Sequence, residues 1–235
     1  MSHRYFSFLI FLSSFLFIEV TLAKTVLVTG SNRGMGLEFV SQYAEKGWNV
    51  IATSRSPSDD NDLINLAKAN PNIQIEKMDV TNVNEILSLA DKYESQSIDL
   101  LINNAGMSGD RANQAWGQID KKEFEKLMSI NAFGALKVSE AFSRNISMSE
   151  EKKIVAISSV AGSISSMGRP SSLPILSISK AALNMAMKTI AMRLKDDGVT
   201  VILMNPGAVD TRALRQAFGL SLEEAEKATN FDYKG

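Results

Sequence analysis

The sequence predicts a single α/β domain built on a doubly wound, all-parallel sheet, and three observations lead to that fold class. Segments with strand-like and helix-like patterns alternate along the 235 residues, a length that suits one domain. A glycine-rich turn directly follows the first expected strand. The fourth expected strand is apolar on both faces, as a buried parallel strand is. Such alternation indicates βαβ units, which place parallel strands side by side and helices on both faces of the sheet.

The first half of the chain supplies four expected strands, each separated from the next by a helical pattern. The strand at 25–29 leads into the glycine-rich turn, and the helix at 35–46 stops at Gly47. Asn70-Pro71 ends the second helix, because the residue before a proline avoids helical dihedrals. The other expected elements of this half are strands at 49–54, 73–77 and 98–103 and helices at 62–69 and 82–93.

The second half continues the same alternation. A long helical pattern covers 121–143, and it is followed by a strand at 153–158, a helix at 179–195 and a strand at 200–205. The segment from 160 to 177 is rich in serine and contains glycine and proline, so we expect an irregular loop there. Long loops at the carboxyl ends of parallel strands are where ligands bind, so this loop is expected to border a binding site.

The first 23 residues have the layout of a secretory signal peptide and are set apart from a domain at 24–235. Arg4 precedes an apolar stretch at 6–18, and the small residue Ala23 ends the segment. Two alternatives stay open. A targeting segment exports the protein or, if it is not cleaved, tethers it to a membrane. Extra residues without a function leave the protein in the cytoplasm.

The composition excludes several kinds of chemistry. The chain has no cysteine and a single histidine, His3, which excludes disulfides, thiolate nucleophiles, histidine triads and cysteine- or histidine-rich metal sites. The formal net charge of -1 argues against the binding of nucleic acid. Acid–base chemistry must therefore come from carboxylates, lysine, tyrosine, hydroxyl groups or water.

The turn after the first strand predicts a dinucleotide site of the Rossmann-fold type. Gly30, Gly34 and Gly36 let the backbone turn tightly and approach a pyrophosphate closely. The helix that follows presents free N–H groups and the positive end of its dipole to the same phosphates. The glycines lie directly between a strand and a helix, which makes them a specific signal.

The end of the second strand favours NADP over NAD. An acidic side chain at this place accepts hydrogen bonds from the free 2′-hydroxyl of NAD, whereas a basic side chain suits the 2′-phosphate of NADP. The strand ends in Ser54-Arg55 with no carboxylate at the turn, and Arg33 in the glycine turn adds a second guanidinium. The sequence therefore predicts that Ser54 and the two arginines contact a 2′-phosphate.

With these motifs the chain resembles the short-chain dehydrogenase/reductase family over residues 24–211. The glycine turn has the TGxxxGxG spacing of that family. Further matches to its pattern are Asp79-Val80, Asn103-Asn104-Ala105-Gly106, Asn131, Ser158-Ser159, Ser179-Lys180 and Asn205-Pro206-Gly207 with Thr211. The wide spacing between Ser159 and Lys180 is similar to that of the sniffer-type and C-factor-like carbonyl reductases.

The resemblance implies hydride transfer between NADPH and a small carbonyl or alcohol substrate, and a homo-oligomeric protein. It implies three catalytic residues: Ser159 polarises the substrate oxygen, Lys180 holds the nicotinamide ribose, and Asn131 supports the proton relay. It also implies a set of residues that bind the cofactor. They are Gly30, Asn32, Arg33, Gly34, Met35, Gly36, Ser54, Arg55, Asp79, Val80, Asn103, Ala105, Gly106, Lys180, Pro206, Gly207, Val209 and Thr211.

One residue of the family pattern is missing. The family carries a proton-donating tyrosine four residues before the lysine, and this chain has Leu176 there. Loss of a positioned general acid typically lowers a rate about 10²- to 10⁴-fold. Three interpretations stay open. The first is a reductase that uses Lys180 through a water, or Ser177 or Ser172, as its proton donor. The second is an NADP-binding sensor or interaction protein without turnover, that is, a pseudoenzyme. The third is a decaying gene copy.

The chain after Thr211 is short for the substrate-covering segment and the seventh strand that the family carries. We expect a helix at 221–229, with Ser221 and Glu224 in a capping-box relation. Residues 231–233 are expected to form the remnant of a strand. The fold is therefore expected to be shortened at its C-terminus, with a reduced substrate lid.

Overall fold

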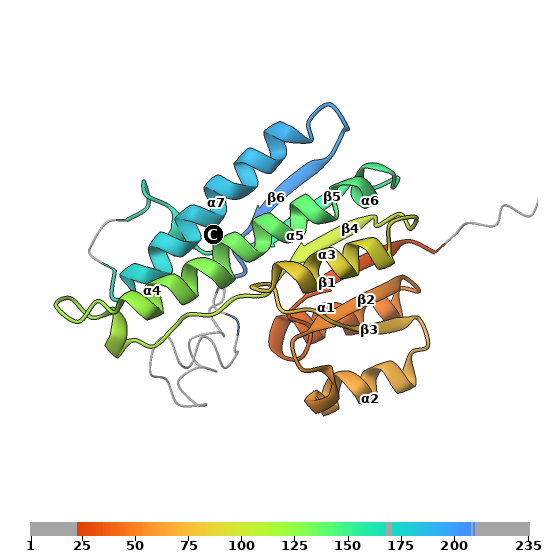
Figure 1. Ribbon diagram of the computed structural model, residues 1–235, viewed down its shortest axis with the longest axis horizontal. Coiled ribbons are helices and arrows are strands. Elements are labelled where there is room, and N and C mark those ends of the chain that lie inside the picture. Colours follow the sequence, from red (N-terminus) through yellow and green to blue (C-terminus); the bar gives the residue numbers. More distant parts are fainter. Residues whose placement is uncertain (1–22, 168–170, 208, 210–235) are drawn as a thin grey trace, which may run out of the picture.

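The computed structural model describes residues 23–167, 171–207 and 209 and contains one six-stranded sheet (Figure 1). The strands are parallel throughout and lie in the order β3-β2-β1-β4-β5-β6. They are β1 (Thr25–Thr29), β2 (Asn49–Ser54), β3 (Ile73–Lys77), β4 (Leu100–Asn103), β5 (Lys153–Ile157) and β6 (Thr200–Met204). The predicted doubly wound parallel sheet is confirmed.

Helices cover both faces of the sheet, because alternate strand residues are apolar on each face. On one face Leu27 and Leu101 belong to the core that α3 (Val83–Lys92), α5 (Ala135–Ala141) and α7 (Pro174–Arg193) complete. On the other face Val26 and Val28 pack with residues of α1 (Gly34–Glu45) and α2 (Asn61–Ala69). The central strands are thus buried on both sides, which explains their continuous runs of Val, Ile and Leu.

The strand order reverses between β1 and β4, which are neighbours although two strands separate them in sequence. In an open α/β sheet the chain leaves the two strands on either side of such a point in opposite directions, so a crevice opens at their carboxyl ends. The glycine turn follows β1 and the Asn103–Gly106 segment follows β4. The topology therefore brings these two motifs together at the crevice.

The long helix predicted at 121–143 is interrupted in the structure. It consists of α4 (Lys121–Met128), a π-helical segment at Ser129–Gly134 and α5. An added Cβ at Gly134 would lie 2.9 Å from the carbonyl oxygen of Val80, so only glycine lets the helix pass this close to the loop before α3. A short helix, α6 (Ser143–Ser147), follows. The helical character of this stretch is confirmed, and the structure adds the π-helical segment and the break before α6.

The helix predicted at 179–195 begins five residues earlier in the structure, at Pro174. Proline is well tolerated in the first turn of a helix, because its missing N–H would have no partner within the helix there. The loop after β5 is correspondingly shorter than expected, and it contains a 3-10 turn at Val160–Gly162. Residue 176 is therefore helical, not part of a loop.

Several predictions concern residues outside the described part of the chain. They are the targeting segment up to residue 22, the C-terminal helix at 221–229, the strand remnant at 231–233, and the cofactor contact of Thr211. Within the described ranges, none of the helices combines the length and the hydropathy that a membrane span requires.

Candidate functional site

The glycine turn is closed so tightly that it has no room for a side chain at Gly30 or Gly36. Gly30 and Gly34 have φ values of +66° and +54°, in the left-handed region that favours glycine. A Cβ added at Gly36 would lie 2.1 Å from the carbonyl oxygen of Gly30. The first turn of α1 therefore packs against the loop without side chains between them, and its free N–H groups lie at an accessible backbone surface. This geometry fits a pyrophosphate.

The segment after β4 is bonded directly to the glycine turn. The Asn104 side chain donates to the carbonyl oxygens of Thr29 and Gly30, at 2.9 and 3.0 Å. The Thr29 hydroxyl accepts from the backbone N–H groups of Asn104 and Ala105, both at 3.0 Å. These hydrogen bonds join the glycine turn to the segment after β4 at the carboxyl ends of the two strands.

Asn103 holds the end of β4 and retains an unused acceptor. Its side-chain NH2 donates to the Ser139 hydroxyl at 2.9 Å, and that hydroxyl donates in turn to the carbonyl oxygen of Ala135. Its side-chain oxygen is buried and has no hydrogen-bond partner among the described residues. Buried polar atoms are nearly always satisfied, so this open acceptor is an exception among the described residues.

The end of β2 differs from the sequence-based expectation. No carboxylate follows Ser54 directly, but the loop folds back and brings Asp60 to it. Asp60 accepts hydrogen bonds from the Ser54 hydroxyl and from the Asn32 side chain, the latter at 3.0 Å. The expectation of a turn without a carboxylate holds for the residues adjoining β2 and fails for the folded loop. Asp60 lies six residues after Ser54, and no local sequence pattern marks its return to the strand.

Arg33 and Arg55 are exposed at the same corner. Neither guanidinium takes part in an ion pair with another described residue. Arg33 begins α1 as its N-cap residue, and Arg55 follows the last residue of β2. The structure thus places both arginines next to the polar group formed by Asn32, Ser54 and Asp60.

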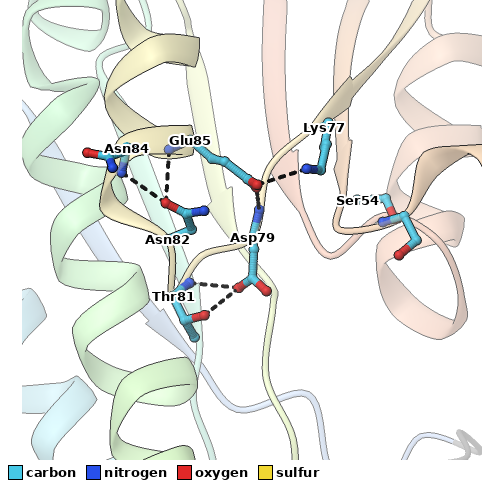
Figure 2. Close-up of polar contacts among 8 residues, drawn as sticks. Ser54, Lys77, Asp79, Thr81, Asn82, Asn84 and Glu85 are labelled. Carbon is cyan, nitrogen blue, oxygen red and sulfur yellow. Dashed lines mark hydrogen bonds and ion pairs between the residues drawn. The ribbon is translucent and has the colours of Figure 1, made fainter.

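Asp79 lies at the end of β3 in a network of hydrogen bonds (Figure 2). Its carboxylate accepts from the backbone N–H and the hydroxyl of Thr81, at 2.8 and 2.7 Å, through a single oxygen. The carboxylate of Glu85 accepts from the Asp79 N–H at 2.8 Å and pairs with Lys77 at 2.9 Å. The N–H of Asp79 and the ammonium group of Lys77 lower the pKa of Glu85. This network fixes the turn before α3, and Val80 is buried beneath it.

Lys180 enters the crevice from α7. Its ammonium group donates to the carbonyl oxygen of Ile157, at the end of β5, at 2.7 Å. Burial lowers the pKa of Lys180 from about 10.5 to about 8. The same group would lie 3.6 Å from a Cβ added at Gly106, so Lys180 packs beside the segment that follows β4. A lysine held in this way can both bind a polar ligand and release a proton near neutral pH.

Asn131 lies in the π-helical segment and is buried. Its side-chain oxygen accepts from the Met107 N–H, and its NH2 group donates to the Met107 carbonyl and to the Ser179 hydroxyl, each at 2.9 Å. Both of its donor hydrogens are therefore used to hold the loop after β4 against α7. The structure brings Asn131 close to the lysine, as expected, and its side chain binds protein groups.

Leu176 lies in the first turn of α7, one turn before Lys180, and its backbone is tied on both sides. Its N–H donates to the side-chain oxygen of Gln114 at 2.9 Å, and its carbonyl accepts from the Ser179 hydroxyl at 2.8 Å. Gln114 is fully buried and donates in turn to the carbonyl of Ser108 at 2.8 Å. Gln114 was not identified from the sequence, because its place in an irregular loop has no periodic signal.

The two tyrosines in the described part of the chain lie far from this position. Tyr93 is buried behind β3, and its hydroxyl, which has one hydrogen to donate, lies 2.8 and 2.6 Å from the side-chain oxygens of Gln74 and Glu76. Tyr43 lies in α1 with its ring tilted against Trp48. The described residues thus contain no phenol near Lys180.

The hydroxyl groups around the crevice have different partners. Ser159 follows β5 and accepts from the N–H of Ala161 at 3.2 Å, which leaves its own hydrogen available. Ser158 donates to Asn184 of α7 at 2.6 Å. Ser177 is buried and donates to Ser171 at 2.9 Å, whereas Ser172 is exposed. Ser158 and Ser159 both follow β5, and of these two only Ser159 keeps its hydrogen free of a partner among the described residues.

The remaining predicted contacts lie at the edges of the crevice. The Ser158 N–H donates to the carbonyl of Met204 at 2.7 Å, which places Pro206 and Gly207 beside the end of β5. Met35 lies in the first turn of α1, and Val209 is partly buried. The structure thus gathers the described part of the predicted set at the carboxyl ends of the strands.

Comparisons with known proteins agree with this arrangement. The family model for short chain dehydrogenases matches residues 24–219. The chain is 33% identical over 219 residues, 90% of its length and 84% of the relative's, to the short chain dehydrogenase gsfK of Penicillium aethiopicum. It is also 30% identical over 190 residues, 80% of its length and 74% of the relative's, to the 3-oxoacyl-[acyl-carrier-protein] reductase FabG of Buchnera aphidicola subsp. Schizaphis graminum.

Solved structures give the same result. One is a putative short-chain dehydrogenase/reductase from Burkholderia multivorans with bound NADP, which superimposes with a TM-score of 0.75, 29% identity and 82% coverage of both chains. Another is the NADPH-bound carbonyl reductase from chicken fatty liver, with a TM-score of 0.74, 31% identity and coverage of 81% of this chain and 82% of that one. The chain therefore belongs to the short chain dehydrogenase family.

Proposed function

We propose that this protein is an NADP-dependent oxidoreductase that interconverts a small carbonyl compound and the corresponding alcohol. The observation that carries the proposal is the shared crevice. The segment after β4 is bonded to the glycine turn on one side and lies beside Lys180, whose pKa is lowered to about 8, on the other. The glycine turn suits a dinucleotide, and the lysine suits proton transfer next to it.

The residues present fit a nicotinamide dinucleotide. The glycine turn would bind the pyrophosphate through backbone N–H groups, while Arg33, Ser54 and Arg55 would contact the 2′-phosphate. Lys180, Asn103 and the segment at 205–211 would surround the nicotinamide end. When bound, this cofactor supplies or accepts a hydride. Relatives solved with NADP or NADPH support this assignment.

Lys180 would provide the proton in place of the family tyrosine. Ser159 would donate a hydrogen bond to the substrate oxygen and hold it in the crevice. Lys180 would give up one proton from Nζ, directly or through a water molecule, to that oxygen as it becomes a hydroxyl group. Its neutral amine would regain a proton from solvent. Asn131 would contribute as a positioning residue, since its side chain holds the loop after β4 against α7.

A second function is favoured by one specific observation, the absence of a phenol near Lys180 among the residues that the structure describes. In that alternative the chain binds NADP without turnover and acts as a sensor or interaction protein. The two functions share the cofactor site and differ only in chemistry.

Two measurements separate these functions. Calorimetry with NADPH tests the shared site, and NADPH oxidation with a panel of aldehydes and quinones tests the chemistry. The matched variant is Lys180→Arg, which keeps a cation and hydrogen-bond donors but stays protonated. We expect this variant to bind NADPH and to lose turnover. If the wild type binds NADPH but oxidises it with none of the substrates, the alternative is the better account; if NADPH does not bind, both functions are rejected.

Two further features belong to the same proposal and have separate tests. Residues 1–23 would act as a targeting segment for a domain at 24–235, which N-terminal sequencing of the expressed protein checks. A homo-oligomeric state, inferred from the family resemblance, is checked by analytical ultracentrifugation. Neither result bears on the chemistry of the crevice.

A further inference from the structure

Asp60 occupies an unusual position for its residue type. It is the N-cap residue of α2, where an aspartate side chain normally accepts hydrogen bonds from the first free N–H groups of the helix. Here the side chain makes no capping bond. Its carboxylate turns away from the helix and accepts from Asn32 in the glycine turn and from Ser54 at the end of β2. It thus connects two segments to which we have assigned cofactor contacts.

The charges at this corner oppose one another. Arg33 and Arg55 are exposed cations without ion pairs among the described residues, and they favour a doubly charged phosphate. Asp60 is partly exposed, and its negative charge repels the same phosphate. Asp60 also competes with the phosphate for Ser54 and Asn32, because both side chains donate to its carboxylate oxygens. A carboxylate in this place instead suits a free ribose 2′-hydroxyl, which can donate to it.

We propose that Asp60 is a specificity-determining residue that weakens the preference of the site for NADPH over NADH. This inference rests on the proposed function, since it concerns the affinity of the dinucleotide site. The two arginines create the preference for the 2′-phosphate, and Asp60 makes that preference smaller. The site therefore takes NADH measurably better than its arginines alone would allow.

The test is Asp60→Asn, which removes the charge and keeps the shape and the capacity to cap α2. Dissociation constants for NADPH and NADH are measured by calorimetry at low salt. We expect the ratio of NADPH to NADH affinity to rise about tenfold, the size expected when one charge near a phosphate is removed at a surface of high effective dielectric. The rise should shrink at high salt, where the charges are screened.

Asp59→Asn is the matched control. Asp59 is the adjacent residue and is exposed, and among the described residues its side chain accepts a hydrogen bond only from the hydroxyl of its neighbour Ser58. Asp59→Asn has the same change in net charge as Asp60→Asn. Its affinity ratio should equal that of the wild type. Asp60→Ser is a second variant that also retains a capping side chain, and it should change the ratio in the same direction as Asp60→Asn.

The outcomes are distinguishable. An unchanged ratio in both Asp60 variants, or an equal loss of affinity for both dinucleotides, overturns this inference and leaves the proposed function intact; Asp60 would then serve only to fasten the loop. Failure of the wild type to bind either dinucleotide overturns the proposed function together with the inference. A higher ratio for Asp60→Asn alongside an unchanged Asp59→Asn supports it.

Discussion

The glycine turn and the start of α7 both belong to the candidate site, and they depend on different parts of their residues: backbone atoms at the turn and a side chain in the helix. At the glycine turn the function comes from backbone, because a single methyl group at Gly36 would overlap the carbonyl of Gly30. At the start of α7 the position of the helix is also fixed by backbone atoms, since the N–H and carbonyl of Leu176 are both hydrogen-bonded. The chemistry there, however, depends on the side chain.

This difference explains how a leucine can stand where the family has a tyrosine. Gln114 and Ser179 bind the main chain of residue 176, which every amino acid except proline can supply. These main-chain hydrogen bonds are therefore kept when the side chain of residue 176 changes, whereas the proton donor is lost. A cofactor site built from glycine backbone has no comparable freedom.

The largest effect is expected from restoring the phenol. Leu176→Tyr should raise the rate of NADPH-dependent carbonyl reduction about 10²-fold or more, because it adds a general acid one helical turn from Lys180. The measurement is kcat in steady-state NADPH oxidation, with Leu176→Phe as the control that adds the ring without the hydroxyl. Equal rates for the two variants would show that the first turn of α7 does not face the reacting atoms.

The next largest effect is expected at the glycine turn. Gly36→Ala should abolish NADPH binding, a loss of at least about 100-fold, and should destabilise the fold by about 1–3 kcal/mol, because a Cβ cannot be placed 2.1 Å from a carbonyl oxygen without moving backbone. Calorimetry and urea unfolding measure the two effects. Gly47→Ala is the control: its Cβ meets nothing within 4 Å, and only its φ of +77° is strained. Normal NADPH affinity in Gly36→Ala would contradict the proposed pyrophosphate site.

A smaller effect is expected from Gln114, whose side chain holds the main chain of Leu176. Gln114→Leu removes the acceptor of the Leu176 N–H and the donor to the Ser108 carbonyl, so the free energy of unfolding should fall by about 2 kcal/mol. Gln118→Leu is the matched control, because Gln118 is exposed in the same loop. Equal unfolding midpoints in urea for the two variants would show that the buried amide does not stabilise the start of α7.

The smallest effect is one of pH. The protonated form of Lys180 predominates below its lowered pKa of about 8 and is lost as the pH rises through that value. The rate of carbonyl reduction at pH 8 should therefore be about half its value at pH 6.5, with a further decline at higher pH. NADPH dissociation constants over the same range separate loss of the proton from loss of binding. A rate that stays constant to pH 9.5 would exclude Lys180 as the donor.

Much of this molecule could be predicted from local pattern. The alternating strands and helices, the tight turn at Gly30–Gly36 and the missing phenol at Leu176 are all properties of short stretches of sequence. Strand burial imposes continuous apolar runs, and a left-handed turn favours glycine, so these features can be recognised without coordinates.

The tertiary structure decided what depends on contacts between distant residues. Asp60 reaches Ser54 and Asn32 only because the loop after β2 folds back, and no periodicity marks that path. The amide of Asn131 is used by Met107 and Ser179, which lie 24 and 48 residues away. The pKa of Lys180 depends on burial by several elements at once. Sequence by itself determined which groups are present, whereas packing determined their partners, because desolvation and hydrogen bonding arise only when separate segments come together.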